Sequence, residues 1–224
     1  GIAFDGDADR MAVVDEQGLP IASDRILALL AHDMLKRHPG TMVVSDVMSS
    51  QVLLDEIRKA GGLPFMWTCG YAPIKAKMVE MHALLAGEMS GHIFIAEDYH
   101  GIDDGFFVAG RLLQLLAAGD QPLSALDAKM SKRHITHEYR PACPEKDKLD
   151  IVDKVREMLE DKGEIVEIDG IRVQFKHGWG VLRASNTEAA LCLRFEGDTE
   201  ANMLEIKELF VNALKQFPQV APLE

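Results

Sequence analysis

Short apolar runs alternate with longer stretches of helical spacing in the first part of the chain. The apolar runs predict strands at residues 2–4, 11–14, 42–45, 65–68, 84–86 and 93–96. Apolar positions three and four apart predict helices at residues 23–38, 52–60, 74–81 and 106–117. Ser23 is a plausible N-cap for the first of these helices. Strands that alternate with helices are typical of a layered α/β domain with a mixed, largely parallel sheet.

The pattern changes after about residue 133. Strands are predicted at residues 134–139, 165–168, 171–175, 181–184 and 190–195, with helices at 149–159 and from Thr199 onward. Asp169 and Gly170 predict the turn of a hairpin between two of these strands. Strands joined by short turns, with a helix on either side of the group, predict a smaller α+β C-terminal domain.

The first 20 residues predict a two-stranded hairpin, which cannot bury a core by itself. Gly1 is not an initiator methionine, and it directly precedes an apolar strand. We therefore expect the chain to begin inside a domain. The predicted organisation is a hairpin from a truncated domain at 1–20, an α/β domain at 21–133 and an α+β domain at 134–224.

Composition excludes several classes of protein. The 224 residues carry 24 Lys and Arg against 36 Asp and Glu, a net charge of -12, which argues against nucleic acid or an anionic membrane surface as a partner. No apolar stretch is long enough for a membrane-spanning helix. The three cysteines are widely spaced, which favours free thiols in a reducing, cytoplasmic location.

An acidic segment follows the first predicted strand. Asp5, Asp7 and Asp9 stand at alternate positions, followed by Arg10. Three carboxylates in one tight turn repel each other unless a cation lies among them, and hard divalent ions prefer oxygen ligands. Three ligands leave positions for water and phosphate, which favours Mg²⁺ over Ca²⁺. The alternative is a solvated acidic turn; an EF-hand is excluded because Arg10 stands where its loop requires glycine.

Two further segments carry polar groups in loops. Between two predicted strands, Glu88, Ser90 and His92 alternate, so that a carboxylate and a hydroxyl can point the same way, as binding of sugar hydroxyls requires. Read alone, this segment is also a polar β-turn. The second segment combines the planar fork of Arg183 with neutral donors and backbone N–H groups that suit an anion. Its donors are Ser185, Asn186 and Thr187, and the alternative is a polar hairpin connection.

Lysines near the start of the predicted 149–159 helix are interleaved with acidic residues. This pattern predicts that Lys146, Lys148 and Lys154 belong to a solvated face.

Taken in order, the three segments resemble the α-D-phosphohexomutase superfamily, in its bacterial phosphomannomutase/phosphoglucomutase branch. The motifs are Asp-Gly-Asp-Ala-Asp-Arg, Gly-Glu-Met-Ser-Gly-His and Arg-Ala-Ser-Asn-Thr-Glu, and residues 101–105 and 178–180 extend the likeness over the C-terminal portion of that family. The resemblance implies that Asp5, Asp7 and Asp9 bind Mg²⁺ and that Arg10 lies at the reaction centre. It further implies sugar-hydroxyl contacts from Glu88 and Ser90. The phosphate that is not transferred would bind to Arg183, Ser185, Asn186 and Thr187.

The reaction implied by the resemblance is the interconversion of hexose 1-phosphate and hexose 6-phosphate through a bisphosphate intermediate. In this family the phosphoryl donor is a phosphoserine of an N-terminal domain, which the chain lacks. The implied partners are therefore a hexose phosphate substrate and the missing N-terminal domains of the same protein, and the chain alone is expected to be inactive. The sequence does not distinguish mannose phosphates from glucose phosphates as substrates.

Two positions depart from the family pattern. Met48 stands where the family often has Lys, and Tyr71 where it often has His. Methionine carries no charge and tyrosine is a poor base at neutral pH, so proton transfer or substrate preference would differ. These departures keep open a non-catalytic sugar-phosphate binding module.

A haloacid-dehalogenase-like phosphatase is the other alternative, because it also places an Asp-x-Asp pair after an apolar strand. Asp9 stands where that class usually has Thr or Val, and the Arg183 segment would have no role in it.

Overall fold

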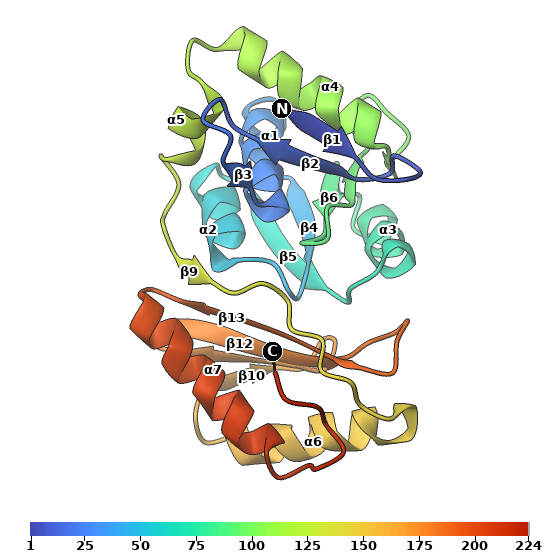
Figure 1. The fold of residues 1–224 in the computed structure, drawn as a ribbon. Helices are drawn as coiled ribbons and strands as arrows, with labels where there is room; N and C mark the ends of the chain where they lie inside the picture. Colours follow the sequence, from blue (N-terminus) through green and yellow to red (C-terminus); the bar gives the residue numbers. More distant parts are fainter. Residues whose placement is uncertain (224) are drawn as a thin grey trace. The chain divides into compact units, whose positions relative to one another are not determined.

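The computed structural model describes residues 1–223 and divides into two compact units, Gly1–Lys132 and Arg133–Glu224 (Figure 1). Each unit has its own sheet and its own hydrophobic core. Within the described residues no helix has the length and apolar character needed to cross a membrane. All three cysteines are free thiols, as their spacing predicts.

The first unit contains a five-stranded mixed sheet. Its order is β5 (Leu63–Trp67), β4 (Met42–Asp46), β6 (Leu85–Gly87), β7 (Ile93–Ile95) and β8 (Ile102–Asp103). The central strand β4 pairs in parallel with β5 and β6, whereas β7 and β8 are added antiparallel. The mixed sheet confirms the predicted fold class, with half of its strand pairings parallel.

Helices cover both faces of this sheet. They are α1 (Ser23–Arg37), α2 (Gln51–Lys59), α3 (Tyr71–Glu80), α4 (Gly105–Ala118) and α5 (Leu123–Asp127). Side chains alternate along a strand, so Val43 faces the core formed with α1, α2 and α4, while Val44 faces the core formed with α3. Burial on both faces explains why residues 42–44 of β4 form an apolar run rather than alternating with polar residues.

The N-terminal hairpin packs onto this unit. Strands β1 (Ile2–Phe4), β2 (Met11–Val14) and β3 (Pro20–Ile21) form an antiparallel sheet. The inward residues Met11 and Val13 join the same core as Val108 and Leu112 of α4. The ribbon shows β1 and β2 beside α4 (Figure 1). The hairpin therefore acquires the core that two strands cannot form alone.

The second unit is an antiparallel sheet with two long helices. The strand order is β10 (Glu164–Val166), β11 (Ile171–Phe175), β12 (Gly178–Ala184), β13 (Leu191–Gly197) and β9 (His134–Ile135). After a short 3₁₀ turn (Glu145–Asp147), helix α6 (Lys148–Leu159) packs with α7 (Glu200–Leu214) against one sheet face, through Val155, Phe195 and Phe210. On β12 and its neighbours the alternate positions carry Arg172, Arg183 and Arg194.

Several local expectations were wrong. Ser23 is the first helical residue rather than the N-cap, a position that Ala22 takes without a side-chain hydrogen bond. Strand β12 begins at Gly178, three residues before the start predicted for the 181–184 strand. The short elements β3, β8 and α5 were not predicted.

Candidate functional site

The candidate site of the first unit is built on the carboxyl ends of three parallel strands. Strands β5, β4 and β6 run in the same direction, so the loops that follow them emerge at one edge of the sheet. Ligands of open α/β sheets bind outside this edge. The loop after β6 is the Glu88 segment, which places one of the three predicted segments at this edge.

Hydrogen bonds join these loops to one another. Asp46, at the end of β4, accepts the Ser49 hydroxyl on Oδ1 at 2.6 Å and the Met89 N–H on Oδ2 at 2.9 Å. Glu88 is 4% exposed, and its Oε1 accepts the Gly70 N–H at 2.5 Å. One Glu88 oxygen therefore positions the start of α3.

Glu88 and Ser90 differ in exposure. Ser90 is exposed on the turn, whereas Glu88 is buried beneath it. The structure thus places the two groups on one loop but at different depths.

The loop that bears the three aspartates is compact. Carboxylate oxygens of Asp5, Asp7 and Asp9 lie within 4.8 Å of one another. Ala8 has a φ of 60°, a left-handed conformation that turns the backbone sharply between the last two of them. Its carbonyl accepts the Gly105 N–H at 3.1 Å, and a Cβ on Gly105 would lie 2.7 Å from that oxygen. Only glycine lets the first turn of α4 support the loop so closely.

Arg10 partly neutralises the acidic loop. Its guanidinium contacts Asp5 Oδ2 at 2.7 Å and Asp9 Oδ1 at 3.5 Å. Desolvation raises the pKa of Asp5, but the hydrogen bonds and charge of Arg10 outweigh it and hold that pKa below its usual value. The pKa of Asp9 is raised, first by desolvation and then by Asp7 and Asp5, against the lowering effect of His92.

The donor set fits a hard divalent cation such as Mg²⁺. Within the described residues, the buried Asp9 Oδ1 accepts no hydrogen bond. A buried polar atom without a hydrogen bond is uncommon and calls for an ion or water. Three clustered carboxylates of this geometry supply the oxygen ligands that Mg²⁺ prefers.

His92 connects the aspartate loop with the Glu88 loop, a role that the sequence did not reveal. The backbones of Arg10 and His92 form an antiparallel bridge. The His92 ring places Nδ1 2.8 Å from Asp103 Oδ2 and 3.6 Å from Asp9 Oδ2. The sequence signal that could have identified the pairing is the 101–105 motif, in which Asp103 lies.

The next residue of that motif fixes the helix that supports the loop. Asp104 is the N-cap of α4: its side chain accepts the Phe107 N–H at 3.0 Å and the Tyr99 hydroxyl at 2.6 Å. The Tyr99 and Phe107 rings stack with centroids 3.8 Å apart. Residues 103–105 therefore brace the aspartate loop.

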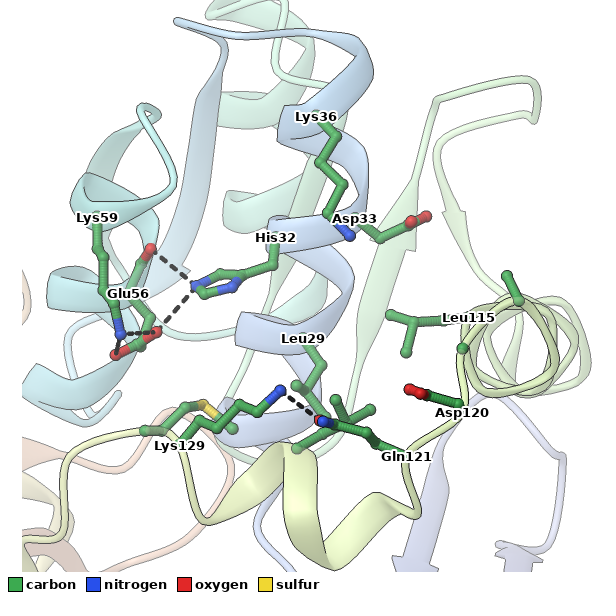
Figure 2. Close-up of a pocket in the computed structure, with 14 residues that line it drawn as sticks. Leu29, His32, Asp33, Lys36, Glu56, Lys59, Leu115, Asp120, Gln121 and Lys129 are labelled. Carbon is green, nitrogen blue, oxygen red and sulfur yellow. Dashed lines mark hydrogen bonds and ion pairs between the residues drawn. The ribbon is translucent and has the colours of Figure 1, made fainter.

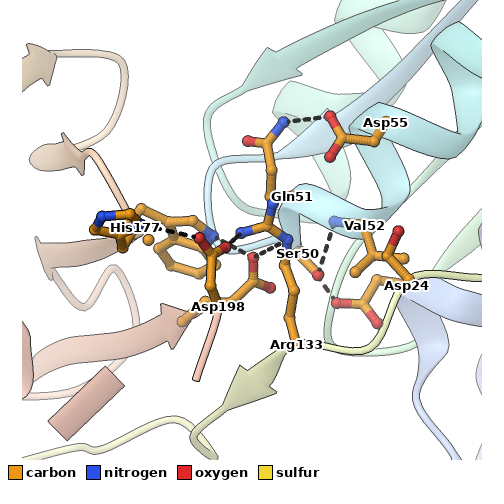
Figure 3. A network of polar contacts seen from close by, with 12 residues as sticks. Asp24, Ser50, Gln51, Val52, Asp55, Arg133, His177 and Asp198 are labelled. Carbon is orange, nitrogen blue, oxygen red and sulfur yellow. Dashed lines mark hydrogen bonds and ion pairs between the residues drawn. The ribbon is translucent and has the colours of Figure 1, made fainter. Parts of the chain in front are cut away.

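A further hydrogen-bond chain fixes the loop after β4 (Figure 3). Asp24 of α1 accepts the Ser50 N–H at 3.1 Å, and the Ser50 hydroxyl accepts the Val52 N–H at 3.0 Å as the N-cap of α2. The rigid backbone that results carries Met48 at the same sheet edge.

In the second unit, Arg183 is held by a turn. It is 6% exposed, and its Nε donates to Asp169 Oδ2 at 2.7 Å. Gly170 beside it has a φ of 72°, and a Cβ there would overlap the Leu182 carbonyl and lie 2.9 Å from the Arg183 Cβ. The predicted hairpin turn thus serves to orient the guanidinium.

The three neutral donors follow Arg183 in a tight turn. The Ser185 hydroxyl accepts the N–H groups of Thr187 at 3.3 Å and Glu188 at 3.1 Å. Ser185 is buried, while Asn186 and Thr187 are exposed. The N–H groups of Thr187 and Glu188 thus point toward one oxygen, the Ser185 hydroxyl, which closes the turn.

Lys148 corrects a sequence expectation. It is 4% exposed rather than solvated, and its Nζ donates to the carbonyls of Ser185 at 2.6 Å and Glu188 at 2.9 Å. Lys154 of the same helix is exposed and pairs with Asp150, as predicted. The two lysines have similar sequence surroundings, and only the tertiary fold distinguishes them.

Other polar contacts of this unit are structural. Arg133 Nη1 donates to Asp198 at 2.6 Å, and His177 Nδ1 lies 3.3 Å from the same carboxylate (Figure 3). The Trp179 ring N–H donates to the buried Glu196 at 3.0 Å. The His177 and Trp179 contacts tie the start of β12 to the end of β13, and the Arg133 contact ties the residue before β9 to the same end.

Comparison with known proteins assigns the family. The family description "Phosphoglucomutase/phosphomannomutase, alpha/beta/alpha domain III" matches residues 22–133, and "Phosphoglucomutase/phosphomannomutase, C-terminal domain" matches residues 138–213. The chain belongs to the phosphoglucomutase/phosphomannomutase family. This confirms the resemblance seen in the motifs and disfavours the haloacid-dehalogenase-like alternative.

Individual relatives agree. A phosphomannomutase/phosphoglucomutase from Pseudomonas aeruginosa is 41% identical over all of this chain and 48% of its own length. A crystal structure of a phosphoglucomutase/phosphomannomutase family protein from Burkholderia thailandensis has a TM-score of 0.90 at 40% identity, covering 100% of this chain and 48% of that chain. The chain therefore spans about half the length of these relatives.

A more distant structure shares the fold. N-acetylphosphoglucosamine mutase from Aspergillus fumigatus, solved with GlcNAc-6P and magnesium, has a TM-score of 0.66 at 14% identity and covers 95% of this chain and 51% of that chain. At this identity the likeness concerns the fold alone.

The two departures from the phosphoglucomutase/phosphomannomutase pattern differ in surroundings. Met48 is 2% exposed, so the thioether is packed in the protein interior. Tyr71 is 43% exposed at the first residue of α3, with its ring 5.5 Å from that of Phe94 and its hydroxyl accepting from Lys75 at 3.1 Å.

A separate hollow of about 460 Å³ lies among α1, α2, α4 and α5 of this family domain (Figure 2). Several of its polar groups pair with each other: the buried Glu56 lies 2.9 Å from His32 and 3.3 Å from Lys59, and Lys129 donates to Gln121. None of the predicted site residues lines this hollow.

Proposed function

We propose that the chain provides the metal, sugar and distal-phosphate sites of a phosphohexomutase that interconverts hexose 1-phosphate and hexose 6-phosphate. The observation that carries this proposal is the cluster of Asp5, Asp7 and Asp9, with the Asp9 Oδ1 lacking a hydrogen bond. Membership in the phosphoglucomutase/phosphomannomutase family supports it.

In this proposal the aspartate loop holds Mg²⁺. The ion would supply neutralisation of the charge on the phosphoryl group that is transferred. Arg10 is 44% exposed in its side chain and bound to Asp5, so it can direct a guanidinium toward phosphate oxygens without leaving the loop. Arg10 would thus stabilise negative charge that develops during transfer.

The sheet edge would bind the sugar. Glu88 is fixed by the Gly70 N–H, and exposed Ser90 follows it on the same turn. We assign hydrogen bonds with sugar hydroxyls to both residues. The contacts that fix Glu88 and Asp46 would keep these groups oriented before the sugar arrives, and such pre-orientation lowers the entropic part of the barrier.

The second unit would hold the phosphate that is not transferred. Asp169 orients the planar guanidinium of Arg183, a group suited to bidentate contact with phosphate. Ser185, Asn186 and Thr187 would add neutral donors. Binding energy at this end of the substrate would position the reacting end.

The phosphoryl donor is proposed to lie in the part of the relatives that this chain does not span. The missing partner is then an N-terminal region with a phosphoserine, and the chain alone would bind sugar phosphate without turning it over. Free thiols at all three cysteines are compatible with a cytoplasmic location.

Reconstitution tests the proposal. We expect the 224-residue chain to show no mutase turnover of glucose 1-phosphate or mannose 1-phosphate with Mg²⁺ and glucose 1,6-bisphosphate. Adding the separately produced N-terminal half of the Pseudomonas aeruginosa relative should give turnover in a coupled spectrophotometric assay, because it returns the serine proposed to carry the phosphoryl group between enzyme and sugar.

The controls distinguish the alternatives. Turnover by the chain alone would contradict the proposed need for a donor. If the mixture forms a complex and binds sugar phosphate but stays inactive, the chain is a binding module rather than part of an enzyme. If the mixture is active, replacing the chain by its Asp9→Asn variant should abolish the turnover.

A further inference from the structure

We propose that Lys148 is a positioning residue that aims the N–H groups of Asn186 and Ala189, in the turn formed by residues 185–189, at phosphate. The inference rests on the proposed role of this turn as the distal-phosphate site. It concerns a residue whose side chain lies behind the turn and does not itself contact substrate.

The ammonium of Lys148 has all three of its donors occupied. Two bind the Ser185 carbonyl at 2.6 Å and the Glu188 carbonyl at 2.9 Å, and the third binds Glu145 Oε2 at 2.7 Å. A lysine ammonium has three donors and no acceptor. The first two contacts hold the carbonyls at the two ends of the segment 185–188, so one buried cation adds to the bonds of the Ser185 hydroxyl in fixing its path.

A charged lysine is destabilised at this position unless its hydrogen bonds compensate. Lys148 is the first residue of α6, where the positive end of the helix dipole opposes a cation. It is also 4% exposed, and burial of an ammonium is costly unless its hydrogen bonds are complete. The carbonyls of Ser185 and Glu188 supply the acceptors that stabilise the buried ammonium.

The geometry of the peptide bond means that the hydrogen bonds of Lys148 also set the direction of the neighbouring N–H groups. In a trans peptide the C=O and the following N–H point in opposite directions. When Lys148 holds the Ser185 and Glu188 carbonyls, the N–H groups of Asn186 and Ala189 therefore point away from the lysine. Within residues 1–223, neither N–H donates to a protein acceptor. Both residues are exposed, so an anion outside the turn can reach these donors.

The matched experiment compares two lysines of one helix. Lys148→Met keeps the length of the side chain but removes the three donors, while Lys154→Met removes an exposed charge that pairs with Asp150 on the helix surface. The 224-residue chain is titrated with glucose 6-phosphate by calorimetry. We expect Lys148→Met to weaken binding by about 10-fold or more, as loss of hydrogen bonds from a charged donor implies, and Lys154→Met by less than about 2-fold.

Two additional measurements separate positioning from stability. Val155→Ala creates a cavity beneath α6 in the core of the second unit. It should destabilise that unit without changing the affinity for glucose 6-phosphate. Amide hydrogen exchange at Ser185 and Glu188 should speed up by about 10-fold in Lys148→Met relative to Val181 of the adjoining strand, because the turn loses its fixed path. Should Lys148→Met not fold, Lys148→Arg keeps the charge with altered donor geometry and should weaken binding by about 3-fold.

The outcomes are distinct. Weaker binding with faster exchange at the turn, in Lys148→Met but not in Val155→Ala, supports the inference. Unchanged affinity in Lys148→Met overturns it, whether or not exchange changes. If the unaltered chain does not bind glucose 6-phosphate, the proposed function of the turn fails instead, and the inference fails with it.

Discussion

Asp9→Asn is expected to weaken Mg²⁺ binding by about 100-fold and, in the absence of metal, to raise the stability of the first unit slightly. The first effect follows because an amide oxygen replaces one of three carboxylates that converge within 4.8 Å. The second follows because the charge of Asp9 is disfavoured in the folded chain: desolvation, Asp7 and Asp5 all raise its pKa. These opposite signs are the signature of a metal site.

The measurement pairs calorimetric titration of Mg²⁺ with thermal unfolding in EDTA. The unfolding midpoint in EDTA should rise by roughly 1–3 °C for Asp9→Asn. Asp120→Asn, which removes an exposed carboxylate elsewhere in the unit, should change neither quantity. Equal Mg²⁺ affinity in Asp9→Asn and the unaltered chain would instead identify the segment as a solvated acidic turn.

Glu97→Gln is expected to destabilise the first unit by on the order of 3 kcal/mol at neutral pH. Glu97 is 4% exposed and binds Arg37 through both oxygens, at 2.8 and 2.7 Å, and also Arg111. Desolvation raises its pKa, but the two arginines outweigh that effect and lower the pKa from 4.5 to about 2. The carboxylate thereby joins the end of α1 to α4.

The direction of the pH dependence follows from this pKa. In the unfolded chain Glu97 takes up a proton near pH 4.5, whereas the folded chain resists protonation until about pH 2. Its contribution is therefore complete above pH 4.5 and is lost as the pH falls toward 2. Urea unfolding, followed by amide exchange in β4, should show a smaller acid-induced loss in Glu97→Gln over this interval.

A surface pair provides the control for Glu97. Glu80 is exposed and binds Lys77 at 2.7 Å, and such pairs contribute little, so Glu80→Gln should cost less than about 1 kcal/mol. If Glu80→Gln and Glu97→Gln cost the same, the contacts between Glu97 and the arginines do not stabilise the fold as proposed.

Sequence patterns predicted most of the regular structure because burial is periodic. Residues 42–44 of β4 are all apolar because Val43 and Val44 face different cores, and helix α1 buries Ile26, Leu27 and Leu30 at helical spacing. The sequence pattern gave the wrong N-cap for α1, because backbone conformation determines where that helix begins. Ala22 takes the N-cap position through its extended backbone (φ -63°, ψ 145°), although Ser23 has the favoured side chain.

The remaining errors arose because tertiary contacts, which the sequence pattern does not contain, determine the structure at these positions. Gly178 and Gly180 look like loop residues in the sequence, but a Cβ at Gly180 would lie 2.5 Å from the Phe210 ring, so glycine there lets α7 pack close to β12. Lys148 could not be told from Lys154, because its acceptors are carbonyls from a segment about 40 positions away. The contact of His92 with Asp9 likewise joins segments that the sequence separates.

The backbone bridge between Arg10 and His92 constrains how this region can diverge. An insertion or deletion in the aspartate loop would shift the bridge and, with it, the turn that carries Glu88 and Ser90. Gly105 limits the loop from the other side, since its N–H holds the Ala8 carbonyl. Among related chains, the lengths of the two loops should therefore change together or not at all, while exposed side chains such as Ser90 remain free to vary with the sugar.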